Sequence, residues 1–249
     1  MDILYIIITG GFTGFSSGMF GIGGSVVATP FLKLLLGLAP IIAIATPLPA
    51  AIPSAASGSF LYHKKHLINY RIAFTAIATA IPMGWIGSYA TDFINPTLLI
   101  VIKAGFLMFL GLKFFISSWL FGKEAMEERT TIIGGLLSGA LAGFVAGFLA
   151  VGGGIVLVTA FVRINYLKMK NAVATSLFCV SVLAIANSIK HYQMGHIDVR
   201  TTLILAMVVI PFSLLGAKTA IALKNKTLER IFGIVMIVFA IFFIITQLV

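Results

Sequence analysis

The sequence predicts an all-α polytopic membrane protein built from two inverted-topology repeats of about five helical segments each. The 249-residue chain is 60% hydrophobic and only 10% charged, with a mean hydropathy of +1.12, values far from those of a soluble domain. Apolar stretches long enough to cross a hydrocarbon core of ~30 Å recur along the whole chain. An internal repeat and an uneven distribution of positive charge supply the rest of the prediction.

The repeat is a motif that occurs twice, 129 residues apart. Gly14-Phe15-x-x-Gly18-x-x-x-Ile22-Gly23-Gly24 reappears as Gly143-Phe144-x-x-Gly147-x-x-x-Val151-Gly152-Gly153. A tandem duplication in a membrane protein is typical of transporters whose site lies between the halves. The same offset pairs further positions without a gap: Ala43 with Ala172, Thr46 with Thr175, Ser59 with Ser188, Arg71 with Arg200, Pro82 with Pro211 and Gly87 with Gly216.

Each repeat contains five apolar segments. In the first repeat, residues 1–120, we expect them at 3–20, 24–37, 41–62, 71–91 and 97–120. A polar linker, 121–131, separates the repeats. In the second repeat, residues 132–249, we expect them at 132–149, 154–162, 171–190, 200–220 and 228–249. The first two segments of each repeat are short and meet at a glycine cluster, which indicates either a hairpin or one helix with an unwound middle.

The distribution of Lys and Arg favours the hairpin. With a hairpin each repeat crosses the membrane an odd number of times, and the positive charges divide 13 to 4 between the two faces, whereas a single broken span divides them 9 to 8. A strong bias is what sets orientation in membrane proteins. We therefore expect inverted repeats in the cytoplasmic membrane, with both termini outside and the linker 121–131 cytoplasmic. Whether the hairpins span fully or are re-entrant stays open.

Several classes of function are not supported. The net charge of +10 is accounted for by basic residues in short loops, so we expect no nucleic-acid partner. The single cysteine, Cys179, excludes an internal disulfide framework. No residues have the spacing of a metal site or of a nucleophile and its base, so we expect no enzyme, metal or cofactor. No carboxylate lies clearly within a span, and no basic stretch before the first apolar run indicates a cleavable signal peptide.

The glycine clusters are the first candidate site. Glycine is unfavourable inside helices by ~1 kcal/mol relative to alanine, and it permits sharp turns. A helix that begins directly after such a turn presents unpaired amides and the positive end of its dipole, which together bind anions. Close packing of helices through small residues is the alternative. The predicted substrate-binding residues in these clusters are Gly23, Gly24, Ser25, Gly152, Gly153 and Gly154.

Polar residues of the third segment of each repeat are the second candidate. Thr46, Thr175 and Ser176 have hydroxyls suited to an oxyanion, although hydroxyls in helices often bond to their own backbone. Asn187 is an amide inside an apolar segment, so it faces either a polar cavity or a neighbouring helix. We interpret His191, near the end of a span, mainly as an interface residue.

The doubled glycine pattern, with Ala-x-Ala-Thr at 43–46 and 172–175, resembles the TauE/SafE sulfite exporter family, also known as the toluene sulfonate uptake permease family. The resemblance covers nearly the whole chain. It implies a secondary carrier for small anions that contain sulfur or carboxylate groups. Gly23, Gly24, Ser25 and Thr46 match the first motif, and Gly152, Gly153 and Thr175 the second. Beside these motifs the second repeat departs from the first, with Gly154 for Ser25, Ser176 for Pro47 and Phe178 for Pro49.

Residues and resemblance together predict a secondary transporter that moves a small sulfur-containing anion, of the sulfite, sulfonate or sulfoacetate type, by alternating access. Export is the expected direction. An anion channel and a non-transporting scaffold or assembly factor are the alternatives. The expected partners are the anionic substrate and the lipid bilayer. The sequence leaves open a coupling proton or cation and a homo-oligomer.

Overall fold

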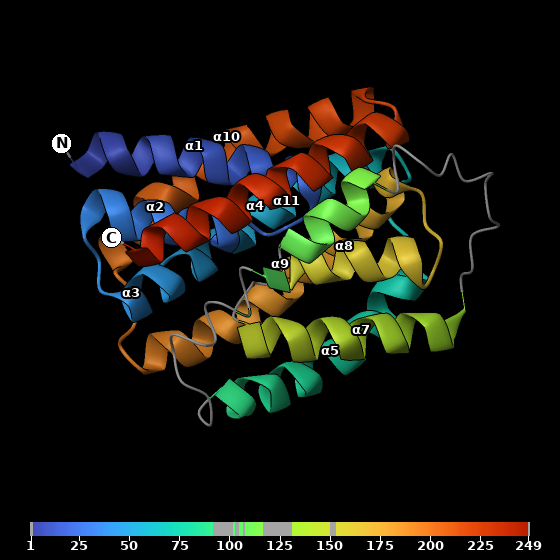
Figure 1. Ribbon diagram of the computed structural model, residues 1–249, viewed down its shortest axis with the longest axis horizontal. Coiled ribbons are helices and arrows are strands. Elements are labelled where there is room, and N and C mark those ends of the chain that lie inside the picture. Colours follow the sequence, from blue (N-terminus) through green and yellow to red (C-terminus); the bar gives the residue numbers. More distant parts are fainter. Residues whose placement is uncertain are drawn as a thin grey trace.

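A computed structural model describes residues 2–91, 102, 105–106, 108–116, 131–149 and 153–248, and within these ranges every regular element is an α-helix (Figure 1). Among the described residues, four helical stretches are long and apolar enough to cross a membrane: 3–20, 41–64, 169–193 and 199–222. The all-helical membrane architecture expected from the sequence is confirmed. The helices are α1 (Asp2–Phe20), α2 (Ser25–Leu36), α3 (Pro40–Ala45), α4 (Pro47–Lys64), α5 (Tyr70–Thr91), α7 (Ile132–Leu149), α8 (Gly154–Arg163), α9 (Met169–Gln193), α10 (Val199–Ala222) and α11 (Asn225–Leu248).

The first two helices of each repeat fold back on each other. α2 packs along α1, and the rings of Phe12 and Phe31 stack with their centroids 6.0 Å apart, which brings the middle of one helix beside the middle of the other. α8 packs on α7 in the same way. With 12 and 10 residues, α2 and α8 are about 18 and 15 Å long at a rise of ~1.5 Å per residue. Each is therefore the short arm of a hairpin.

One predicted segment is divided in the structure. The sequence predicts a single segment over 41–62, whereas α3 ends at Ala45 and α4 begins at Pro47. Proline has no amide hydrogen and is tolerated in the first turn of a helix, so Pro47 starts a new helix. Its equivalent Ser176 lies inside the continuous helix α9. The two repeats thus differ where their sequences differ.

Contacts between the repeats are reciprocal. α1 of the first repeat packs on α10 of the second, and α7, which is equivalent to α1, packs on α5, which is equivalent to α10. α4 and its equivalent α9 pack on each other between these pairs. α1 and α7 run in opposite directions across Figure 1. Both repeats therefore use the same contacts, with their roles exchanged.

Glycines permit these close contacts. A Cβ on Gly216 of α10 would overlap the carbonyl oxygen of Phe15, and a Cβ on Gly87 of α5 would overlap that of Phe144. Phe15 and Phe144, like Gly87 and Gly216, are 129 residues apart. Small residues that let helix backbones approach are a common basis of helix packing in membranes. Gly14 and Gly143 of the repeated motif have the same role, because a Cβ on either would overlap the backbone of α10 or α5, at Val209 and Ala80 respectively.

The remaining elements lie beside this arrangement. Residues 108–116 are helical and pack on α11, where the rings of Phe114 and Phe232 have centroids 5.0 Å apart. The N-terminal end of α1 and the C-terminal end of α11 lie at the same end of the molecule in Figure 1. Residues 117–130 lie outside the described part of the chain. The linker over 121–131, and with it the division into 1–120 and 132–249, stays a prediction.

Candidate functional site

The two glycine turns have nearly the same geometry. Gly24 precedes α2 with φ 80° and ψ −25°, and Gly153 precedes α8 with φ 74° and ψ −35°. Both conformations have a positive φ, which glycine adopts without the steric cost that other residues incur. No side chain caps either helix, so the first amides of α2 and α8 point into the protein interior without an intrahelical acceptor.

The turns lie against each other. The position of a Cβ on Gly154 would overlap the backbone of Gly21 and Ile22. The hydroxyl of Ser176 lies 3.0 Å from the carbonyl oxygen of Gly21 and 3.1 Å from that of Gly154, and its proton is directed to this pair of acceptors. Ser176 therefore ties the two turns together. The positive ends of two short helices meet in the middle of the bundle.

The two threonines of the repeated motif also form a reciprocal pair of contacts. The backbone amide of Asp198 donates to Thr46 Oγ1 at 3.2 Å, and that of Asn69 donates to Thr175 Oγ1 at 3.0 Å. Asn69 and Asp198 are equivalent in the repeat. Each threonine therefore fixes the start of a long helix in the opposite repeat, α10 for Thr46 and α5 for Thr175. The motif that predicted a ligand site builds the interface between the repeats.

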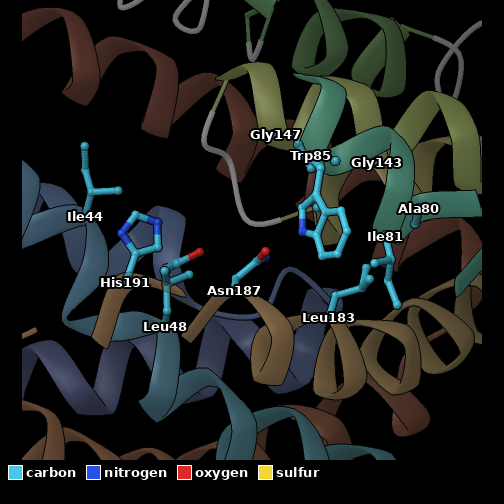
Figure 2. Close-up of a pocket in the computed structure, with 14 residues that line it drawn as sticks. Ile44, Leu48, Ala80, Ile81, Trp85, Gly143, Gly147, Leu183, Asn187 and His191 are labelled. Carbon is cyan, nitrogen blue, oxygen red and sulfur yellow. The ribbon is translucent and has the colours of Figure 1, made fainter. Parts of the chain in front are cut away.

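A cavity of about 110 Å³ opens beside the second glycine turn. Gly153 lies at one wall, and Ser25, the first residue of α2, lies at another, so both short helices contribute their N-terminal ends. In Figure 2, Leu183, Asn187 and His191 follow one edge of the cavity along α9, and Trp85 faces them from α5. The other lining residues are Ile44, Leu48, Ala80, Ile81, Gly84, Gly143, Ala146 and Gly147.

The polar groups of the cavity suit an anion. Ser25 and Asn187 carry a hydroxyl and an amide that can donate hydrogen bonds, and the ends of two helix dipoles add positive potential. Among the described lining residues there is no Asp or Glu. Asp198, which precedes α10, accepts hydrogen bonds from the amides of Arg200 and Thr201.

The structure divides the predicted site residues into three groups. Ser25, Gly153 and Asn187 line the cavity. Gly23, Gly24 and Gly154 are buried in the turns behind it. The third group, which is buried and bonded between the repeats, consists of Thr46, Thr175 and Ser176. Gly152 lies outside the described residues.

Two lining side chains that carry polar atoms, His191 and Trp85, were not among the predicted site residues. His191 follows Asn187 by four positions, and Leu183 precedes it by four. Residues four apart share one face of a helix, so this spacing was the signal that could have found His191. Trp85 has no such signal, because only the packing of α5 against α7 brings it to the cavity.

Comparisons with known proteins identify the family of the chain. The family described as "Sulfite exporter TauE/SafE" matches residues 6–243. The "Probable membrane transporter protein YunE" of Bacillus subtilis (strain 168) is 24% identical, with 95% of each chain covered. A "Probable membrane transporter protein" of Xylella fastidiosa (strain 9a5c) is 26% identical, covering 98% of this chain and 97% of its own. The chain therefore belongs to the TauE/SafE sulfite exporter family and is a multi-pass membrane transporter.

Proposed function

We propose that the chain carries a small sulfur-containing anion, of the sulfite, sulfonate or sulfoacetate type, and binds it in the cavity between Ser25, Gly153 and Asn187. The observation that carries this proposal is the meeting of two helix N-termini at a cavity without carboxylates. A helix N-terminus is a ready-made anion site because its amides are unpaired and its dipole is positive. The family description, which names sulfite exporters, supports the sulfur-containing class.

The size of the cavity supports a compact substrate. Pockets for drug-sized ligands measure ~300–1,000 Å³, and this cavity has about 110 Å³. An oxyanion of a few non-hydrogen atoms needs little apolar contact and several hydrogen-bond donors. Ser25 and Asn187 would supply those donors directly, and the first-turn amides of α8 would supply the rest.

The reciprocal contacts support alternating access. Repeats that exchange roles across a shared interface can exchange conformations, which turns an opening on one side into an opening on the other. We infer that the repeats have inverted topology in the cytoplasmic membrane, with both termini outside. Export is the direction we assign.

Transport by purified protein in liposomes tests the site. Asn187→Ala removes the amide from the cavity and keeps α9 intact. A hydrogen bond to a charged group is worth ~1.5–3 kcal/mol, so uptake of radiolabelled sulfite, sulfate or sulfoacetate at limiting concentration should fall about tenfold or more for the transported anion.

Ser181→Ala is the matched control on the same helix, because its hydroxyl donates to the carbonyl oxygen of Phe178 at 2.7 Å and does not line the cavity. This variant should transport as the unmodified protein does. Equal flux in Asn187→Ala and Ser181→Ala would remove Asn187, and with it the cavity, from the anion's path.

A further inference from the structure

The open cavity has an equivalent in the other half of the molecule, and there the equivalent space is filled. Subtracting the repeat offset from Ala146, Gly153, Leu183 and His191 gives Ser17, Gly24, Ser54 and Tyr62. Around these residues, within the described part of the chain, the helices are packed tightly. A Cβ on Gly18 would overlap the backbone of Ser213 on α10. Ser213 corresponds to Gly84 in the other half, and a Cβ on Gly84 would have only the carbonyl oxygen of Gly143 within 4 Å, at 3.5 Å.

Tyr62 closes this half. Its side chain is fully buried, and its hydroxyl donates to the carbonyl oxygen of Gly18 at 2.8 Å. Beside it, Ser213 Oγ donates to the carbonyl oxygen of Ser54 at 2.6 Å. Leu177 packs on Gly58, and Gly58 is the equivalent of Asn187 in the open half. The equivalents of Tyr62, Ser213 and Leu177 all line the open cavity.

Three hydroxyls are buried behind this closure without a partner. Ser17 and Ser54 are 0% exposed and Thr13 is 4% exposed, and none of their hydroxyl oxygens has a hydrogen-bond partner in the described part of the chain. Thr13 and Ser17 lie against Gly24: their carbons are 2.6 and 3.6 Å from the position of its Cβ. Ser54 lies one contact further on, bonded to Ser213, whose backbone lies against Gly18. Leaving a buried polar group unpaired is costly, so two such groups at the N-terminus of α2, with Ser54 behind Gly18, point to a ligand that is absent when this half is closed.

We propose that Ser17 and Ser54, with the first-turn amides of α2, form a second anion-binding half-site, which Tyr62 occludes in this structure. The half-site takes the same class of small oxyanion as the open cavity, because hydroxyl and amide donors at a helix N-terminus recognise negative charge. It continues the open cavity directly, since Ser25 lies in that cavity and follows Gly24 in the chain. This inference rests on the proposed function. It adds the position at which the anion is bound when the first half is open and the present cavity is closed.

Cysteine accessibility tests the half-site with a matched pair of positions. Cys179, the single cysteine, is fully buried and is first replaced by alanine. Ser17→Cys then probes the closed half, and Ala146→Cys probes the equivalent position in the open cavity. The label is a membrane-impermeant anionic methanethiosulfonate, applied from either side of sealed vesicles, and methanesulfonate is the competing anion.

Ala146→Cys should react from one side and Ser17→Cys from the opposite side, and methanesulfonate should slow both reactions. Tyr62→Phe removes only the hydroxyl that holds Gly18. It should raise the labelling rate of Ser17→Cys by about tenfold and lower that of Ala146→Cys, because the closed half then opens more often at the expense of the other. Ser54→Cys, on a different helix, gives the same measurement if Ser17→Cys does not fold.

Protection of Ala146→Cys without protection of Ser17→Cys and Ser54→Cys would overturn the second half-site and leave the proposed function standing. A rise in both labelling rates in Tyr62→Phe would show general loosening and would also overturn it. Protection at none of the positions would contradict the proposed function as well as the half-site.

Discussion

The two glycine turns have almost the same backbone and very different surroundings. Behind Gly24 lie Thr13 and Ser17, whose hydroxyls are buried, and behind Gly153 lies Ala146. The first half is closed by Tyr62, whereas its equivalent His191 lines an open cavity. The duplicated backbone therefore preserves the helix ends, whereas the side chains around them have diverged, and in this structure the two halves differ both in openness and in the polarity of their buried groups.

The largest effect is expected where the two halves are most alike. Gly216→Leu and Gly87→Leu each place a side chain on a backbone carbonyl of the facing helix, which cannot move aside as a side chain can. Overpacking costs typically ~1–3 kcal/mol, and contact with backbone belongs at the upper end. Both variants should give little monodisperse protein in size-exclusion chromatography after detergent extraction.

Gly105→Leu is the control, because a Cβ there would have nothing within 4 Å. A normal yield of monodisperse protein for Gly216→Leu but not for Gly87→Leu would contradict the equivalence of the α1–α10 and α5–α7 crossings.

The next comparison separates the two turns. Gly24→Ala and Gly153→Ala both put a side chain at positive φ, which costs ~1–2 kcal/mol. The Cβ at Gly24 would also lie 2.6 Å from the methyl group of Thr13, whereas the Cβ at Gly153 would have ordinary contact at 3.5 Å with Ala146. Thermal unfolding should therefore occur at a lower temperature in Gly24→Ala. Equal melting temperatures would mean that the closed half accommodates the added methyl group as easily as the open half does.

A smaller effect is expected at the reciprocal threonines. Thr46→Val and Thr175→Val each leave a backbone amide of the opposite repeat without its acceptor. An unsatisfied buried donor costs ~1–3 kcal/mol, and the two variants should lower the melting temperature by similar amounts. Thr219→Val, which removes an exposed hydroxyl bonded to Leu215 of its own helix, should change it little. A large difference between Thr46→Val and Thr175→Val would contradict their equivalent roles.

The smallest effect is expected at Ser176, which has no hydroxyl equivalent because Pro47 stands there in the first repeat. Ser176→Ala removes the hydroxyl between the carbonyl oxygens of Gly21 and Gly154. A typical hydrogen bond contributes ~0.5–1.5 kcal/mol, so a drop in melting temperature smaller than that of Thr175→Val is expected. A larger drop would mean that the turns depend on this link more than on the contacts between the long helices.

Much of the fold could be predicted from the sequence because hydropathy and the repeat both report on helices. The predicted segment 71–91 and helix α5, Tyr70–Thr91, agree closely. The break at Thr46 was missed, because hydropathy continues smoothly across Pro47 while the backbone hydrogen bonds do not.

The site was predicted less completely. Glycine turns are visible in a sequence because few other residues adopt positive φ, and Asn187 is conspicuous in an apolar segment. Whether a hydroxyl faces a ligand or a backbone amide depends on the neighbouring helix, so Thr46 and Thr175 could not be told apart from ligand groups. Trp85 reaches the cavity only through tertiary packing.

Counterflow in proteoliposomes tests the central claim, that a small anion is carried through alternating cavities, most directly. Vesicles are loaded with a high concentration of unlabelled sulfite and diluted into a trace of radiolabelled sulfite. A carrier exchanges one anion for another, so labelled sulfite should accumulate transiently above its external concentration, and Asn187→Ala should slow this accumulation about tenfold or more. Labelled sulfite that enters without any overshoot would contradict alternating access and favour a channel.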